Sequence, residues 1–169
     1  MAYTVLAPNP IQARESLQIV IYAASRIEAL DNLASFYIRD NNFSRATKLK
    51  RLIIGSNVTG YKNTAINSLG IGANHLLKDL DIRNCPNLTG SLNLTQCENL
   101  VNLYANNTAI TAVSFATGGQ ITNAYLPSTV STLSCNNLYR LTNLQMAGYD
   151  QLSTFYCIDS NVINPLSIV

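Results

Sequence analysis

The sequence contains no tryptophan and a single histidine, and only 12% of its 169 residues are charged. Its formal net charge of +2 is too small to indicate a nucleic-acid partner or an anionic membrane surface. No stretch approaches the roughly 20 consecutive apolar residues that a membrane-spanning helix needs. The first ten residues also lack the basic segment of a secretory signal peptide, so an extracellular role requires another export route. We therefore expect no nucleic-acid partner and no membrane insertion.

The residue types that build metal and catalytic sites are equally scarce. The four cysteines are separated by 12, 38 and 22 positions, which is not a zinc-site spacing, and His75 has no ligand pattern beside it. No serine has a partner histidine, and the glycines of "ATGGQ" (116–120) lack the lysine of a P-loop. Asp79 and Asp81 resemble a glycosidase carboxylate pair, but an open strand ladder offers no cleft for a sugar. We expect a protein that is not an enzyme and has no cofactor and no metal site.

What the sequence does contain is a repeat. Residues 69–90, "LGIGANHLLKDLDIRNCPNLTG", state the pattern L-x-x-L-x-L-x-x-(N/C)-x-L almost twice, which is the leucine-rich repeat signature. We call the middle apolar residue of each unit its anchor. The anchors are 9 to 12 positions apart from Leu69 onward and 16 or 17 apart before it, and the residue two positions after every anchor is apolar. The twelve anchors are Val20, Phe36, Leu52, Leu69, Leu80, Leu92, Leu103, Val113, Ala124, Leu133, Leu144 and Phe155.

The spacing of the anchors predicts a coil with two sides. The anchor-x-apolar triplet has the two-residue period of a strand with one face buried. A unit of about 11 residues is too short for a leucine-rich-repeat coil of roughly 20–29 residues, so two units should form one coil. The predicted fold is mainly β, a leucine-rich-repeat solenoid with two units of about 11 residues per coil. Side one should stack Leu80, Leu103, Ala124 and Leu144, and side two should stack Leu69, Leu92, Val113, Leu133 and Phe155.

The two ends of the chain should differ from its middle. We predict one continuous domain with an α/β N-terminal cap and wider coils over 1–60, the short-repeat solenoid over 61–162 and a tail over 163–169. The wide N-terminal steps leave room for a helical turn at Arg26–Ser35 or Ser44–Leu49, and Asn9-Pro10 suits a helix start. The segment "LQIVIYAAS" reads as a strand. The coil Leu152–Val162 should be uncovered unless the tail or another chain packs on it.

A second set of positions should stabilise the turns from inside. Five residues after several anchors stands an asparagine or a cysteine, whose side chain is expected to point inward and to bond turn backbone. Cys135 and Cys157 instead occupy positions filled by leucine or isoleucine elsewhere, which favours small buried thiols. One disulfide or a metal site among the four cysteines is an alternative. The expected structural ladder is Asn41, Asn57, Asn74, Cys85 and Cys97.

Outward positions are the ones free to bind a partner. On side two they are small and hydroxylic, whereas side one carries carboxylates, amides and two tyrosines expected one coil apart. Such a face stabilises its own cross-strand pairs, anchors a protein partner or covers a sugar ring. A loose basic cluster, Arg39, Arg45, Lys48, Lys50, Arg51 and Lys62, is a solvated face or a site for an acidic partner. The candidate binding residues are Asp79, Asp81, Asn102, Tyr104, Asn123, Tyr125 and Asn143.

The wording of the repeats also resembles one family. The segments "KLKRLIIGSNVTGYKN", "LLKDLDIRNCPNLTGSLNLTQCENLVNLYANNTAITAVSF", "GGQITNAYLPSTVSTL" and "LTNLQMAGYDQLSTFYCIDSN" are similar to the repeat region of large virion structural proteins of tailed bacteriophages that infect gut bacteria. The resemblance spans roughly Ser25–Val162. It implies a tail- or baseplate-associated component that contacts other virion proteins or a host surface receptor, and it supplies no catalytic residues.

Two features depart from that family. Ala116-Thr117 stands where the family often has Pro-Asn, and the family embeds this region in much longer chains. The sequence therefore predicts a non-enzymatic protein–protein interaction module located in a virion, with a homo-oligomer as a further expectation. The alternatives are a receptor- or glycan-binding adhesin module and a bacterial cell-surface leucine-rich-repeat protein, either of which would be extracellular.

Overall fold

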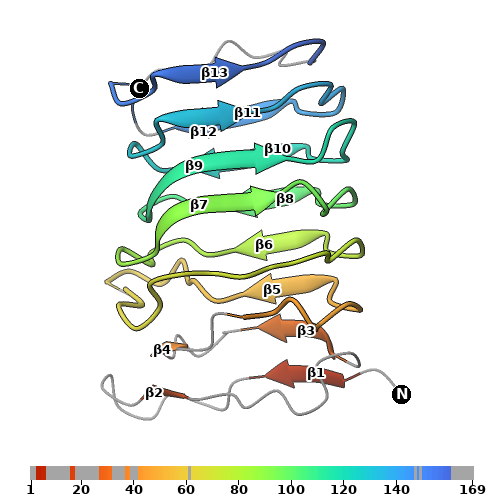
Figure 1. Cartoon of the computed structure of the whole chain (residues 1–169). Helices are drawn as coiled ribbons and strands as arrows, with labels where there is room; N and C mark the ends of the chain where they lie inside the picture. Colours follow the sequence, from red (N-terminus) through yellow and green to blue (C-terminus); the bar gives the residue numbers. More distant parts are fainter. Residues whose placement is uncertain are drawn as a thin grey trace.

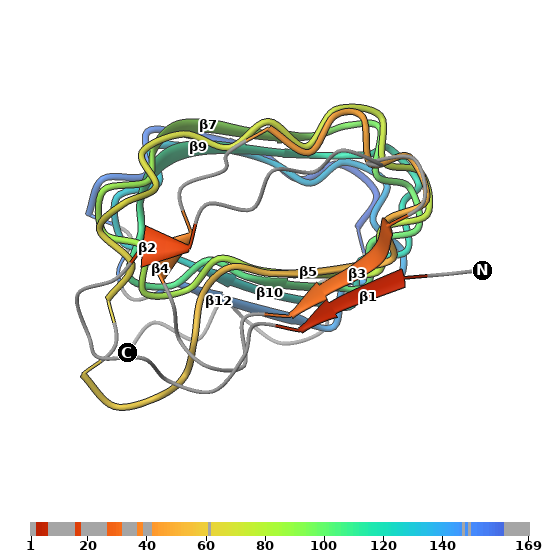
Figure 2. The ribbon, with the colours of Figure 1, turned by 90° about the horizontal axis from the view of Figure 1, so that it is seen from below.

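The chain forms a β-solenoid. The computed structural model describes residues 3–6, 16–17, 27–31, 37–38, 42–60, 62–146, 148 and 150–160. Throughout these ranges the regular elements are strands, and the paired strands run parallel. Successive coils stack along one axis (Figure 1), and each coil crosses from one flat side to the other (Figure 2). The prediction of a mainly β solenoid is confirmed.

Side one of the solenoid is a seven-stranded sheet. Its strand order is β1-β3-β5-β6-β8-β10-β12, so each strand pairs with the strand one coil before it and one coil after it. The strands are β1 (Tyr3–Leu6), β3 (Ile27–Asp31), β5 (Arg51–Ile53), β6 (Asp79–Asp81), β8 (Asn102–Tyr104), β10 (Asn123–Leu126) and β12 (Asn143–Met146).

Side two is a shorter, four-stranded sheet of order β13-β11-β9-β7. Its strands are β7 (Thr89–Leu94), β9 (Ala109–Phe115), β11 (Thr132–Ser134) and β13 (Thr154–Tyr156). A third sheet pairs only β2 (Ser16–Leu17) with β4 (Tyr37–Ile38). Seen along the axis, β7 and β9 lie opposite β5, β10 and β12 (Figure 2).

The register of both sheets follows the predicted anchors. Leu80, Leu103, Ala124 and Leu144 are successive Cα partners on side one, as expected. Leu92, Val113, Leu133 and Phe155 are successive partners on side two. The side-one row continues before Leu80 through Leu52, Leu30 and Val5. Leu30 is therefore the residue stacked on Leu52, a position that the anchor steps of 16 and 17 did not identify.

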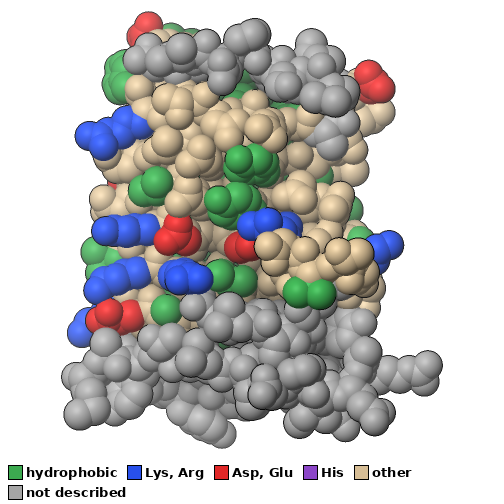
Figure 3. Space-filling model, turned by 180° about the vertical axis from the view of Figure 1, so that it is seen from behind, with side chains coloured by type: hydrophobic (Ala, Val, Ile, Leu, Met, Phe, Trp, Pro, Cys, Tyr) green, Lys and Arg blue, Asp and Glu red, His purple; other side chains and the backbone are tan. Residues whose placement is uncertain are grey.

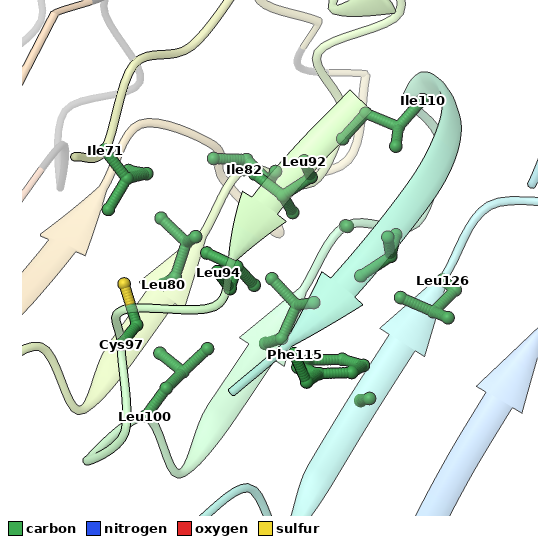
Figure 4. Packing of buried hydrophobic residues seen from close by; sticks show 14 of the residues in the cluster. Ile71, Leu80, Ile82, Leu92, Leu94, Cys97, Leu100, Ile110, Phe115 and Leu126 are labelled. Carbon is green, nitrogen blue, oxygen red and sulfur yellow. The ribbon is translucent and has the colours of Figure 1, made fainter. Parts of the chain in front are cut away.

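The anchors and their partners form one continuous hydrophobic core between the two sheets. Leu52, Leu80, Leu103 and Leu133 are fully buried, and Phe43 is 2% exposed. Figure 4 shows leucine, isoleucine and phenylalanine side chains from both sheets pointing toward one another. Burying a leucine contributes about 1.5–3 kcal/mol, so a core repeated from coil to coil is a main source of the stability of the solenoid.

The helical turn expected at Ser44–Leu49 is wrong. This segment is instead two consecutive tight turns, in which the Ala46 N–H donates to the Phe43 carbonyl and the Leu49 N–H donates to the Ala46 carbonyl, both at 2.9 Å. Phe43, Ala46 and Leu49 are buried because each turn returns the chain to the core after three residues. Apolar residues three positions apart are typical of a helix as well. Here, however, each hydrogen bond joins a carbonyl to the N–H three residues later and closes a separate turn.

The helix expected within Arg26–Ser35 is also wrong over residues 27–31, which form strand β3. Parallel pairing with β1 and β5 fixes that strand, and Leu30 is 2% exposed in the core. The α/β cap is accordingly not found in the described part of residues 1–60. The expected helix start at Asn9-Pro10, most of the strand 17–25, the anchors Val20 and Phe36, the ladder residue Asn41 and the tail 163–169 lie outside the described residues.

Side two begins one coil later than the repeat predicts. Leu69 was expected below Leu92, but no strand forms there within residues 62–77, and the only pairing is an isolated bridge between Asn42 and Gly70. Gly72 has a φ of +65°, and a Cβ added there would lie 2.6 Å from the Cβ of Ser44. The segment around Gly72 therefore packs closely against the preceding coil. Because it forms no strand beside β7, β7 is the edge strand of the four-stranded sheet.

Candidate functional site

The seven predicted binding residues lie together on the outer face of the seven-stranded sheet. Asp79, Asn102, Asn123 and Asn143 are register partners in one row, and Asp81, Tyr104 and Tyr125 are register partners in the next row. Each row flanks the buried anchors, because alternate residues of a strand point to opposite faces. We call these seven residues the side-one face. Figure 3 shows this side of the molecule, with hydrophobic side chains near its centre beside acidic and basic ones.

The asparagine row is a chain of side-chain hydrogen bonds with one direction. The Nδ2 of Asn123 donates to the Oδ1 of Asn102 at 2.8 Å, and the Nδ2 of Asn102 donates to the Oδ1 of Asp79 at 2.7 Å. Asn143 joins the row at 3.5 Å and donates to the hydroxyl of Tyr125 at 2.8 Å. Asp79 ends the row as a carboxylate, which accepts hydrogen bonds without donating any.

The two tyrosines stack one coil apart, as the sequence predicts. The ring centroids of Tyr104 and Tyr125 are 5.1 Å apart with an interplanar angle of 14°. The guanidinium carbon of Arg83 lies 4.3 Å from the centroid of Tyr104, so it forms a cation–π contact. A guanidinium and two rings thus form a column along the sheet. Aromatic pairs of this kind contribute about 0.5–1.5 kcal/mol beyond their buried area.

Arg83 belongs to the candidate site by its contacts, and sequence reasoning missed it. Its side chain is held by Asp81, whose Oδ1 and Oδ2 each accept from Nε at 2.9 Å and whose Oδ2 lies 2.8 Å from Nη2. Asp81 is only 9% exposed, so the pair is partly shielded from water. The signal available in the sequence was the Asp-x-Arg spacing at the end of the strand triplet.

Gly55 allows the backbone of Arg83 to take this position. A Cβ at residue 55 would lie 2.2 Å from the carbonyl oxygen of Arg83, which a side chain cannot do. The N–H of Gly55 donates to the carbonyl of Asp81 at 3.0 Å. The glycine therefore brings two coils into close contact directly behind the Asp81–Arg83 pair.

The outer face of the four-stranded sheet is built differently. Hydroxyls at the start of its strands bond to the backbone of the preceding coil: Ser131 Oγ, just before β11, donates to the Thr111 carbonyl, and Ser153 Oγ, just before β13, donates to the Ser131 carbonyl, both at 3.1 Å. Thr111 Oγ1 donates in the same way to the carbonyl of Gly90 at 3.3 Å. These short side chains connect neighbouring coils and project little beyond the sheet.

The inward positions agree with the predicted structural ladder in three of its described members. Asn74 is fully buried, and its Nδ2 donates to the carbonyls of Phe43 and Ile71. Burial raises the pKa of the Cys85 thiol to about 12 and that of Cys97 to about 11. Both thiols are therefore protonated at neutral pH and are structural.

Asn57 does not point inward, because it is exposed in the loop that follows β5. The buried asparagine of its coil is Asn63, which is fully inaccessible and accepts from the N–H of Ala65 at 3.0 Å. The irregular coil that follows β5 places Asn63 at the inward position, and that coil also breaks the repeat spacing.

Of the basic cluster, Arg51 lies in β5 and Lys50 directly before it, whereas Arg39 lies outside the described residues. Lys50 pairs with Glu28 at 2.9 Å, and this hydrogen bond is the largest cause of the lowered pKa of Glu28. Lys48, Lys50 and Lys78 are exposed, and the N–H of Lys78 donates to the carbonyl of Lys50. Arg51 is the register partner of Asp79, so positive charge continues the face toward β5.

Two shallow hollows lie outside the side-one face. The first, of about 430 Å³, is lined by Lys62, Asn84, Pro86, Asn107 and Thr108. The second, of about 370 Å³, separates residues 69–72 from the edge of β7 and is lined by Leu69, Gly70, Ile71, Gly72, Ser91, Asn93, Thr95 and Gln96. Among the described residues that line them there is no carboxylate, histidine or cysteine.

The side-one face is the part of the described surface where polar and aromatic side chains are connected across several coils. Over these ranges no three side chains of histidine, cysteine, aspartate or glutamate gather where they could hold a metal ion. Nor does this part of the chain contain a helix long and apolar enough to cross a membrane. Comparison of the chain with protein-family models, curated proteins and solved structures finds no match. The side-one face is therefore the candidate site on its own geometry.

Proposed function

We propose that the chain is a non-enzymatic leucine-rich-repeat module that binds a protein partner through the side-one face. The observation that carries this proposal is that the side chains of the face already hold one another in place. Asn102 is fixed by Asp79 and Asn123, and Tyr104 is fixed by Arg83 and Tyr125. A face ordered before binding loses little side-chain entropy when a partner docks.

The tyrosine column favours a protein partner over a glycan. A sugar ring binds an aromatic residue by covering its face, but one face of Tyr104 carries the Arg83 guanidinium and the other carries Tyr125. What remains accessible on Tyr104 is the edge of the ring and its hydroxyl, which suits the flat polar contacts of a protein interface. A glycan-binding adhesin module is the alternative, and it would have to use the face of Tyr125 that points away from Tyr104, together with the amides of the row.

The biological setting that we propose is a bacteriophage virion, in a tail- or baseplate-associated position. The resemblance of the repeats to phage virion proteins supports this setting. Other virion proteins or a host surface receptor are the proposed partners, and self-association is a further one. A bacterial cell-surface location is the alternative setting for the same module.

The virion setting is tested by measuring whether purified phage particles contain the chain. Virions of the phage that encodes the chain are purified, and the chain is quantified by mass spectrometry relative to the major capsid protein. We expect a fixed copy number that survives density-gradient purification. A chain that is absent from virions and present on bacterial envelopes would contradict the virion setting and support the cell-surface alternative.

The face itself is tested with paired variants in the same phage. Tyr104→Ala combined with Tyr125→Ala should reduce incorporation at least tenfold, whereas Ser114→Ala combined with Ser134→Ala on the opposite sheet should leave it unchanged. Circular dichroism of each purified variant confirms that the solenoid is intact. Equal incorporation of both folded variants would contradict a virion protein as the partner of the face, and equal binding of both variant virions to host cells as well would contradict the assignment of the face.

A further inference from the structure

Cys135 and Cys157 are neighbours across two adjacent coils. The register of β11 and β13 pairs Leu133 with Phe155 and Ser134 with Tyr156, and continuing it places Cys135 opposite Cys157. Neighbouring strands lie about 4.8 Å apart. That separation falls inside the range of roughly 4.4–6.8 Å that the Cα atoms of a disulfide occupy.

The side chains and the backbone around the pair agree with this placement. Cys135 is fully buried, and Cys157 is half-buried and packs against the same core. The N–H of Cys135 donates to the carbonyl of Tyr156 at 2.8 Å, and its Sγ donates to that carbonyl at 3.4 Å. Burial, the charge of Cys157 and the hydrogen bond between the two thiols together raise the pKa of Cys135.

The turn that carries Cys157 is fixed to the turn that carries Cys135. The N–H of Ile158 donates to Asn136 Oδ1 at 3.0 Å, and the N–H of Asn137 donates to the carbonyl of Ile158 at 2.7 Å. Ser160 Oγ donates to the Cys135 carbonyl and accepts from the N–H of Leu138 at 3.0 Å. These bonds hold the two cysteines in register along the solenoid axis.

We propose that Cys135 and Cys157 form a modification site, at which a disulfide oxidant such as oxidised glutathione closes a bond that clamps the last described coil to the coil before it. Oxidised glutathione supplies the oxidising equivalents, and the two cysteine thiols lose two electrons and two protons. The bond closes a loop of 22 residue steps that includes exposed Phe155 and Tyr156, and exposed Ile158 follows it directly.

The exchange takes two steps. The thiolate of Cys157, which is the more accessible of the two, attacks one sulfur of oxidised glutathione, and one glutathione thiolate leaves. The thiolate of Cys135 then attacks Sγ of Cys157. The mixed disulfide between Cys157 and glutathione breaks, and the second glutathione leaves as a thiolate. Cys135 is buried, so the second step requires a brief opening of the terminal coil and should be the slower one.

The other two cysteines provide the internal control. Cys85 follows β6 on side one and Cys97 follows β7 on side two, so neither has a cysteine as its register neighbour. Both are buried, at 0% and 3% exposure. The proposed chemistry therefore predicts one specific pairing among the four thiols.

The test uses the full chain in a glutathione redox buffer, quenched with iodoacetamide and digested with trypsin under non-reducing conditions. Cleavage after Arg140 separates the peptide that carries Cys135 from the peptide that carries Cys157. We expect a linked peptide pair in the wild type and in Cys85→Ala and Cys97→Ala. The pair should disappear in Cys135→Ala and Cys157→Ala.

Two further readouts keep the proposal falsifiable if a buried variant fails to fold. Chymotryptic digestion of oxidised wild type assigns the linked cysteines without any substitution. Amide hydrogen exchange in Ser153–Tyr156 should slow at least tenfold on oxidation and recover with dithiothreitol. A glutathione adduct on Cys157 that never resolves, a link to Cys85 or Cys97, or unchanged exchange after linking would overturn the proposal.

Discussion

The two sheets of the solenoid share one core but have different outer faces. The seven-stranded sheet is continuous from β1 to β12, whereas the four-stranded sheet begins only at β7. On the first face side chains bond to side chains, as in the row from Asn143 to Asp79. On the second face hydroxyls bond to the backbone of the preceding coil.

This difference separates two uses of an outward position. A serine that donates to a carbonyl stabilises its own coil and presents little to a partner. A tyrosine or an asparagine that bonds to its equivalent one coil away builds a surface that extends across several coils. The anchors are apolar on both sides, so the outward residues distinguish the two sides, and we propose the first as the side that binds a partner.

The largest expected effect compares the two rows of anchors. Leu80→Ala and Leu133→Ala remove the same group from fully buried positions. Large-to-small core changes cost about 2–5 kcal/mol. We expect the upper part of that range for Leu80, which is central in the longer sheet, and the lower part for Leu133. Urea unfolding measures both, with Phe155→Ala, at 40% exposure, as a control of much smaller effect. A larger loss of unfolding free energy for Leu133→Ala than for Leu80→Ala would contradict the view that the longer sheet contributes more to stability.

The second expected effect concerns the coil where side two is interrupted. Asn74→Ala removes the amide that donates to the carbonyls of Phe43 and Ile71 and leaves both without that partner. An unsatisfied buried polar group costs about 1–3 kcal/mol. Asn99→Ala, which removes an exposed bond to the carbonyl of His75, should change stability by about 0.5 kcal/mol or less. Equal midpoints for the two variants in urea would contradict the role of Asn74.

The third effect compares the outer faces directly. Asn102→Ala interrupts the asparagine row at its middle and should cost about 1 kcal/mol. Ser131→Ala removes one hydroxyl-to-carbonyl bond from the opposite face and should cost about 0.5 kcal/mol or less. A double-mutant cycle of Asn102→Ala with Asp79→Ala should show a coupling energy of at least about 0.5 kcal/mol. Additive losses would mean that the row is not a connected network.

The smallest effect is expected at a corner between the sheets. The hydrogen bond with His75, at 2.7 Å, lowers the pKa of Glu98, so the folded state favours the carboxylate. The stabilisation is present above the unfolded pKa of a glutamate, about 4.3, and is lost as the pH falls through the folded value. Both side chains are about half exposed, so Glu98→Gln should cost about 0.5 kcal/mol or less. Urea midpoints should differ from wild type at pH 6 and coincide at pH 3; a difference that grows at pH 3 would contradict this sign.

The sequence predicted what repeats and missed what breaks the repeat. The anchor positions placed the register of β6 to β13, because an inward leucine every coil leaves little freedom. Leu69 was assigned to a strand that does not form. Nearby Gly72 passes close to Ser44 of the preceding coil, and a tertiary contact of this kind is not visible in the repeat spacing. The turns at Ser44–Leu49 were taken for a helix, because a three-residue spacing of apolar residues does not distinguish the two.

The candidate site divides in the same way. The stacked tyrosines and the asparagine row follow from the repeat spacing of side one. Arg83 could not be placed, because its position depends on the close passage of Gly55 behind it. The hydroxyl bonds of side two were also unforeseen, since short side chains reach the neighbouring backbone only when the coils are in register.

The central claim is that the side-one face is ordered before any partner binds. Amide hydrogen exchange of the free chain, resolved to single residues by NMR, tests it most directly. We predict slow exchange through β6, β8 and β10 and exchange at least a hundredfold faster in residues 67–72, where side two lacks a strand. Fast exchange at Leu80, Leu103 and Ala124, equal to that of residues 67–72, would contradict a pre-ordered face and the function proposed for it.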